Sequence, residues 1–125
     1  MKELFSYSSN SPQLVQSIGT VPNPLFQINF DIIEETREDM NSDTITQYKS
    51  HYVNVSKLEY SIIVSAIIQS RYTSSDIEAI VLNNMEAQDS SSSISDDKRS
   101  EYIYEYNELQ TWRIHAKEIA QQAIV

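Results

Sequence analysis

The chain has 125 residues, a length that suits one domain able to bury roughly two-thirds of the surface that its unfolded chain exposes. It carries 18 acidic and 9 basic residues, a formal net charge of −9. Duplex DNA and anionic membranes are therefore poor partners, because polyanions are bound by clustered Lys and Arg. The absence of cysteine from the sequence excludes disulfides, thiol catalysis and cysteine-based zinc sites.

Residues 1–23 are rich in Ser, Asn and Pro, and we expect an N-terminal arm. Within this arm, residues 11–19 place Ser and then Pro at one end and Gly at the other, the asymmetry typical of a short helix. Such a helix has few apolar residues and needs a surface to pack on. The two prolines in Val21–Pro24 force extended backbone and prevent a helix from crossing that junction.

Residues 24–55 are predicted to form an antiparallel β-hairpin. The first strand has one apolar side, made by Phe26, Ile28, Phe30 and Ile32 at a period of two. Residues 34–43 are polar and acidic, and Met40–Asp43 is typical of a turn. The second strand, over residues 44–55, is rich in β-branched and aromatic side chains. A lone hairpin is marginally stable, so this one must pack on the helices or pair with another edge.

Residues 56–88 are predicted to form a helix pair. Ser56 with Glu59 fits a capping box, and Ser75 with Glu78 fits a second one. Apolar residues follow each box at helical spacing: Leu58, Ile62, Ile63, Ala66 and Ile67, then Ile77, Ile80, Val81 and Met85. The longest apolar run, residues 62–68, is much shorter than the about 20 residues of a membrane span. It is therefore predicted to be core, and no membrane partner is expected.

Residues 89–95 are a serine-rich, low-complexity segment and are predicted to be a mobile linker. Residues 96–123 are predicted to form one long amphipathic helix, with two acidic residues near its positive end. The following residues lie along one side of this helix: Tyr102, Tyr106, Leu109, Trp112, Arg113, Ala116, Ile119, Ala120 and Ala123. The fold class is therefore α+β: after the arm, residues 24–125 form a single domain of hairpin, helix pair and long C-terminal helix.

The motifs that usually mark catalysis or cofactor binding are missing from the sequence. His115 and Glu118 are three positions apart and could share a metal, but zinc needs three or four ligands and di-iron sites need several carboxylates. A structural role is therefore the favoured interpretation, and we predict no metal, no cofactor and no catalytic residue. A small hydrolase remains a remote alternative, which would require a pocket that joins His115 to two carboxylates.

Two groups of side chains are candidates for binding a partner. Acidic residues gather around the expected hairpin turn: Asp31, Glu34, Glu35, Glu38, Asp39 and Asp43. They form either a solvated hairpin tip, the favoured interpretation, or a surface for a basic protein. Aromatic residues are dense in the last helix: Tyr102, Tyr104, Tyr106 and Trp112. Tyr104 is expected to be exposed, and aromatic residues with polar tips are favoured at interfaces, although packing within the chain is the simpler alternative.

Three segments carry a resemblance to known proteins: residues 53–68, 71–84 and 105–120. In combination they resemble a group of small, mostly uncharacterised proteins from phages and prophages of gut Bacteroidales bacteria. In that group a polar hairpin precedes a helix pair, and a helix containing Trp-Arg closes the chain. The resemblance covers residues 26–124. It implies a role in the virion or in its assembly, and it supplies no catalytic residue.

Two functions follow as expectations. The first is a non-enzymatic phage protein, either a minor tail- or capsid-associated virion component or an assembly chaperone. Its partners would be other phage structural proteins or a second copy of itself, in the virion or in the cytoplasm of the host bacterium. The alternative is an acidic inhibitor that occupies the nucleic-acid groove of a host defence protein, which would need carboxylates spaced like phosphates along one face.

Overall fold

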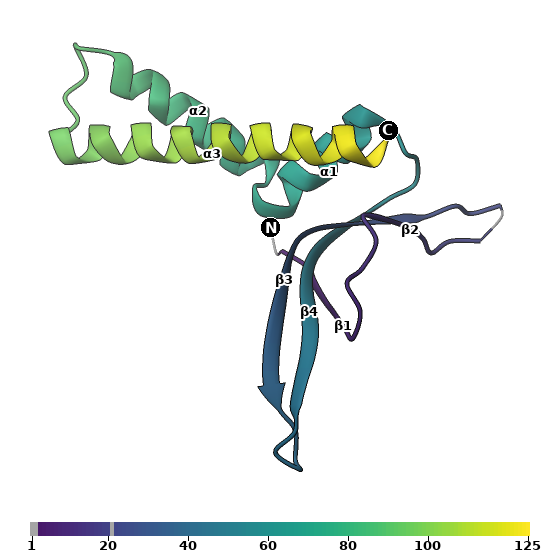
Figure 1. Ribbon diagram of the computed structural model, residues 1–125. Coiled ribbons are helices and arrows are strands. Elements are labelled where there is room, and N and C mark those ends of the chain that lie inside the picture. The colour runs from purple at the N-terminus through teal and green to yellow at the C-terminus, as the bar shows by residue number, and fades with distance from the viewer. Residues whose placement is uncertain (1–2, 21) are drawn as a thin grey trace.

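The structure is a computed structural model that describes residues 3–20 and 22–125, and its α+β fold confirms the predicted class (Figure 1). The described elements are β1 (Phe5–Ser8), β2 (Val15–Ser17), β3 (Phe26–Glu38), β4 (Thr44–Val55), α1 (Tyr60–Arg71), α2 (Ser74–Gln88) and α3 (Asp96–Ala123). The strands form one antiparallel sheet in the order β1-β4-β3-β2. The helices form a layer at one end of the sheet, and the β3–β4 hairpin extends away from it (Figure 1).

The predicted hairpin is confirmed, but a β-bulge divides it into two parts. The register runs from Phe26 opposite Val55 to Phe30 opposite His51, and it resumes with Ile33 opposite Lys49. The one extra residue on β3 reverses the alternation of sides, because side chains on a strand alternate with a period of two. Ile32, expected on the buried side, is therefore 38% exposed.

The prediction of a short helix over residues 11–19 is wrong, because Val15–Ser17 forms β2 and pairs with residues 26–28 of β3. A helix this short has little stability of its own, whereas the edge of β3 offers ready backbone partners. Gly19 lies where the chain turns back, and a Cβ there would come within 2.3 Å of the backbone nitrogen of Leu25. Of the predicted extended segment Val21–Pro24, Val21 lies outside the described residues.

The arm also covers the polar side of β3. Asn29 is fully buried, and its amide donates hydrogen bonds to the carbonyl of Gln13 and to Oε1 of Gln16. The backbone N–H of Asn29 donates to the carbonyl of Leu14. Both sides of the first half of β3 are thus covered, although the sequence pattern predicted only one.

The helix pair is confirmed, but neither predicted capping box forms. α1 begins at Tyr60, with Glu59 at the N-cap position and no side-chain cap, so Ser56 stays in the preceding loop. The box of α2 joins Thr73 to Asp76 instead of Ser75 to Glu78. The Thr73 hydroxyl accepts from the Asp76 N–H at 3.0 Å, and the Thr73 N–H donates to the Asp76 carboxylate at 2.9 Å.

The long helix is confirmed as α3, and Ser95 caps it by accepting from the backbone N–H of Lys98. The linker over residues 89–95, expected to be mobile, is tied to both flanking helices. Arg99 donates hydrogen bonds to the carbonyls of Ala87, Asp89 and Ser92. A single guanidinium therefore holds the end of α2 and the linker against the first turn of α3.

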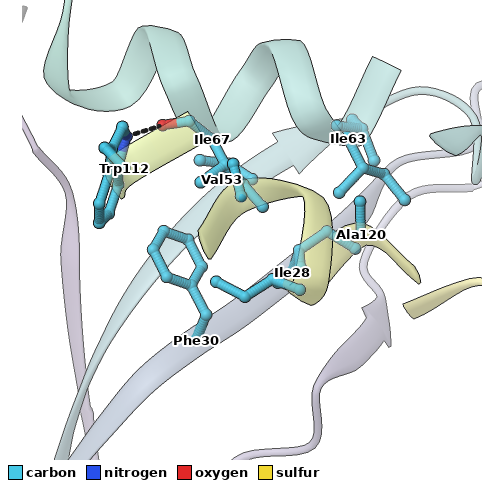
Figure 2. Packing of buried hydrophobic residues seen from close by; sticks show 10 residues of the cluster. Ile28, Phe30, Val53, Ile63, Ile67, Trp112 and Ala120 are labelled. Atoms are coloured by element: carbon cyan, nitrogen blue, oxygen red, sulfur yellow. Dashed lines mark hydrogen bonds between the residues drawn. The ribbon is translucent and has the colours of Figure 1, made fainter. Parts of the chain in front are cut away.

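The core lies between the helices and the first half of the hairpin (Figure 2). Its buried residues are Ile28, Phe30, Val53, Val55, Ile63, Ile67, Trp112, Ala116, Ile119 and Ala120. The indole N–H of Trp112 donates to the carbonyl of Ile67 at 3.1 Å. The predicted inward sides of α1 and α3 are correct at these positions, whereas Leu58, Val81 and Met85 of the predicted stripes are exposed.

The capping assignment predicts that Thr73→Ala lowers the free energy of unfolding by about 1 kcal/mol, because the backbone N–H of Asp76 loses its acceptor, the Thr73 hydroxyl. Ser75→Ala and Ser56→Ala are the controls and should each change it by less than about 0.5 kcal/mol. Urea unfolding followed by circular dichroism measures the three values. A larger loss in Ser75→Ala than in Thr73→Ala would contradict the assignment.

The same box predicts a pH dependence. Hydrogen bonds from Thr73, chiefly from its backbone N–H, hold the pKa of Asp76 below its usual 3.8. A pKa lowered in the folded state means that ionised Asp76 stabilises the fold above pH 3.8, and this stabilisation is lost as the pH falls through the folded pKa. The difference in the free energy of unfolding between wild type and Asp76→Asn, measured by urea unfolding, should become smaller as the pH is lowered from 3.8 through the folded pKa. A constant difference would contradict the role of the carboxylate.

Candidate protein interaction surface

Beyond the bulge, the hairpin leaves the helical layer as a two-stranded ribbon (Figure 1). We call residues 33–38 of β3 and 44–49 of β4, with their connecting turn, the distal ribbon. β2 pairs only with residues 26–28 of β3, and β1 pairs with residues 48–51 of β4. Among the described residues, β3 therefore has no neighbour on its outer edge along the whole distal ribbon.

The two faces of the distal ribbon differ in composition. One face continues from the core side and carries Ile33, Glu35, Arg37, Ile45, Gln47 and Lys49. The opposite face carries Glu34, Thr36, Glu38, Thr44, Thr46 and Tyr48. Ile33 is 53% exposed, so the ribbon presents an apolar side chain amid polar ones.

The turn of the ribbon lies at the predicted segment, Met40–Asp43, and the structure shows that Asp39 stabilises it. The Asp39 carboxylate accepts hydrogen bonds from the backbone N–H groups of Asn41 and Asp43, both at 2.9 Å. Ser42 has a φ of 63°, in the left-handed region that tight turns often use. The Asp39 carboxylate is thus hydrogen-bonded within the turn. On the β3 part of the distal ribbon, Glu34 and Glu38 are exposed, whereas Glu35 is partly buried.

Asp31 does not join the other acids of the predicted cluster. It lies in the bulge with a φ of 51°, a conformation that Asp tolerates better than most residues. The bulge places its carboxylate 2.6 Å from Nε2 of His115 on α3. This contact joins residues 84 positions apart, and neither residue carried a local signal for it.

The predicted His115 and Glu118 pair lines a cavity of about 280 Å³ together with Asp31, so His115 does meet two carboxylates, as the hydrolase alternative required. The cavity is small, and His115 is already paired with Asp31 within it. Within residues 3–20 and 22–125, no cluster of three or more His, Cys, Asp or Glu has the geometry to hold a metal. The ring of His115 instead packs near Trp112, with 5.7 Å between ring centroids. His115 therefore contacts the sheet through Asp31 and the core through Trp112.

A second network, which sequence reasoning missed, fastens the N-terminal segment to the core. The Glu3 carboxylate lies 2.8 Å from Nε of Arg71 and 3.3 Å from Nδ1 of His51. The Arg71 guanidinium in turn stacks over the ring of Trp112, 3.7 Å from its centroid. These contacts cross between the arm, the sheet and two helices, so no local sequence pattern could indicate them.

The aromatic residues predicted for partner binding lie in different environments. Trp112 is 5% exposed and belongs to the core, while Tyr102 and Tyr106 are half-buried. Tyr104 is 65% exposed, as expected, and it lines a cleft. Of the four, Tyr104 is the side chain most available to another molecule.

The cleft lies where the end of α1, α2 and the first half of α3 meet. It has a volume of about 640 Å³ and is lined by Arg71, Tyr72, Asp76, Ala79, Ile80, Asn83, Tyr104, Glu105 and Glu108. Burial raises the pKa of Tyr72, against the opposing charge of Arg71 and with a smaller contribution from Glu108. We call this hollow the α2–α3 cleft.

Comparisons with protein-family models, with curated proteins and with solved structures gave no match. None of the described helices combines the length and the apolar character that crossing a membrane requires. The functional argument therefore depends on the residues and geometry of the chain itself.

The arrangement predicts unequal protection of the backbone along β3. Amides of residues 33–38 should exchange with deuterium much faster than those of residues 26–30, because only the latter are covered by helices and by the arm. Hydrogen exchange read by NMR at low protein concentration measures both groups. Equal protection would show that the distal ribbon is already covered in solution.

Proposed function

We propose that this chain is a non-enzymatic bacteriophage protein that acts through protein–protein contacts. It serves either as a minor virion component, associated with the tail or capsid, or as an assembly chaperone. The resemblance carried by residues 53–68, 71–84 and 105–120 supports the phage assignment. The partners are other phage structural proteins or a second copy, met in the virion or in the host cytoplasm.

The distal ribbon is the observation that carries the proposal. A two-stranded ribbon outside a packed core is marginally stable in water, so a long ribbon adds little to the stability of the domain. Contact with a partner would stabilise it. The outer edge of β3 offers backbone groups to which a partner strand can add. Exposed Ile33 supplies apolar contact, while Glu34 and Glu38 favour a partner surface that is basic.

The position of the bulge adds to this argument. Asp31 and Ile32 end the part of the hairpin that the helices cover, and His115 holds Asp31 at that point. Bulges bend a strand and increase its twist, so this one aims the ribbon away from the helical layer. A ribbon that is fixed at its base and free along its length suits insertion between the subunits of a larger assembly.

The alternative, an acidic decoy of a host defence protein, is less well supported by the placement of charge. Many carboxylates lie in two separate groups, one on the distal ribbon and one in a row on α3 (Asp97, Glu101, Glu105 and Glu108), and the others are scattered over the chain. These two groups lie on elements that point apart (Figure 1). The row on α3 spans only about 17 Å, at 1.5 Å per residue, which is short for a mimic of a nucleic-acid strand.

Affinity capture of the tagged chain during phage infection of its host tests the proposal. Wild type should recover an identified tail or capsid protein, and Glu34→Lys/Glu38→Lys should recover at least about tenfold less, because like charges then face the basic partner. Glu59→Lys/Glu78→Lys makes the same change of charge outside the ribbon and its base, and should behave as wild type. A monomer that recovers no viral protein would overturn the proposal.

Mass spectrometry of purified virions then separates the two forms of the proposal. A virion component is present in the mature particle, whereas an assembly chaperone is present in infected cells and absent from the particle. The same ribbon variant should lower incorporation in the first case and the yield of particles in the second.

A further inference from the structure

The α2–α3 cleft has a lining of mixed chemistry that the distal ribbon does not share. Its walls include the exposed ring of Tyr104, the partly buried ring of Tyr72 and the aliphatic side chains of Ala79 and Ile80. Carboxylates from two helices border the same space, with Asp76 on α2 and Glu105 and Glu108 on α3. The cleft thus joins an aromatic and aliphatic wall to an acidic rim.

Acidic residues outnumber basic ones in the lining of the cleft. Its one basic residue, Arg71, is already engaged by Glu3 at 2.8 Å and by stacking over Trp112. Within the described residues, neither Glu105 nor Glu108 has a Lys, Arg or His nitrogen within 4.0 Å. Lys98 of α3 is paired with Glu101 at 3.2 Å, and the charge of Glu105 contributes least among the causes that raise the pKa of Lys98. The rim of the cleft therefore has negative charge that the chain itself does not neutralise.

We propose that the α2–α3 cleft binds an arginine side chain of a protein partner. A guanidinium stacks on aromatic rings and donates hydrogen bonds from its edge to carboxylates, and the cleft offers both kinds of contact. The volume of about 640 Å³ accommodates such a side chain together with part of its backbone. The inference rests on the proposed function, because the basic side chain belongs to a protein that the chain contacts.

This cleft and the distal ribbon lie on different elements, so they contact different parts of a partner or different partners. Both carry net negative charge, which is consistent with the excess of 18 acidic over 9 basic residues. Electrostatic attraction to a basic partner then acts at both surfaces and speeds its encounter, most strongly at low ionic strength.

The test uses a peptide probe, so that it does not depend on the partner. Acetyl-Gly-Arg-Gly-amide is titrated into the ¹⁵N-labelled full chain, with the citrulline peptide as the uncharged analogue of the same shape. We expect shifts of backbone amides in residues 76–83 and 104–108, and affinity about fivefold weaker for the citrulline peptide. Equal affinity for the two peptides, or shifts confined to the distal ribbon, would overturn the inference.

Variants locate the binding within the chain. Glu105→Gln/Glu108→Gln should weaken the arginine peptide about fivefold, and Tyr104→Ala should weaken it through loss of the aromatic face. Glu78→Gln/Glu118→Gln removes two charges away from the cleft and should change the affinity less than about twofold. Tighter binding of acetyl-Gly-Glu-Gly-amide would show that Arg71 dominates the cleft and would also overturn the inference.

The outcomes separate this inference from the proposed function. If the arginine peptide fails to bind while affinity capture still depends on Glu34 and Glu38, only the cleft assignment is wrong. If the peptide binds and no viral protein is captured, the cleft stands and the phage role is wrong.

Discussion

The packing of Trp112 is the interaction on which the rest of the structure depends. Its indole N–H donates to the carbonyl of Ile67, so α3 is joined to α1 in a buried setting. Loss of such a buried partner costs about 1–3 kcal/mol. The centroid of the same ring lies 6.2 Å from the ring centroid of Phe30 in the sheet. The Arg71 guanidinium also stacks over the Trp112 ring. One side chain therefore links the helical layer, the sheet and, through Glu3, the N-terminal segment.

The fixed base formed around Trp112 explains how a long ribbon can extend from a small domain. Helices cover the hairpin only as far as Phe30, and the contact between Asp31 and His115 holds the strand where that cover ends. Beyond this point the strands are stabilised by their mutual pairing and by the turn built on Asp39. The domain thus places a polar, acidic ribbon with an exposed Ile33 in solvent, while its core remains compact.

Two of the surfaces that carry acidic residues are candidates for binding a partner. The ribbon carries Glu34 and Glu38 along an open strand edge, which suits backbone pairing with a partner strand. The α2–α3 cleft carries Glu105 and Glu108 beside Tyr104, which suits capture of a single basic side chain. A partner that met both surfaces would be held by strand pairing at one and by a charged anchor at the other, a combination that raises affinity without enlarging either surface.

The sequence by itself determined the elements whose signals are local. The period of 3.6 in residues 96–123, the alternation that begins at Phe26 and the polar turn after it each follow from short-range geometry, and all three are confirmed. It also indicated that Tyr104 would be exposed and that a hairpin needs cover. Helix starts were predicted less well, because Thr73 competes with Ser75 for the same cap and only the folded backbone decides between them.

Only the tertiary structure decided the features that join distant parts of the chain. Residues 15–17 form a strand instead of a helix because the edge of β3 supplies backbone partners that local propensity does not register. The bulge at Asp31, the burial of Asn29 and the gathering of the cleft residues from three helices arise in the same way. Each depends on contacts between residues far apart in sequence, and the free energy of those contacts exceeds the small differences that local patterns express.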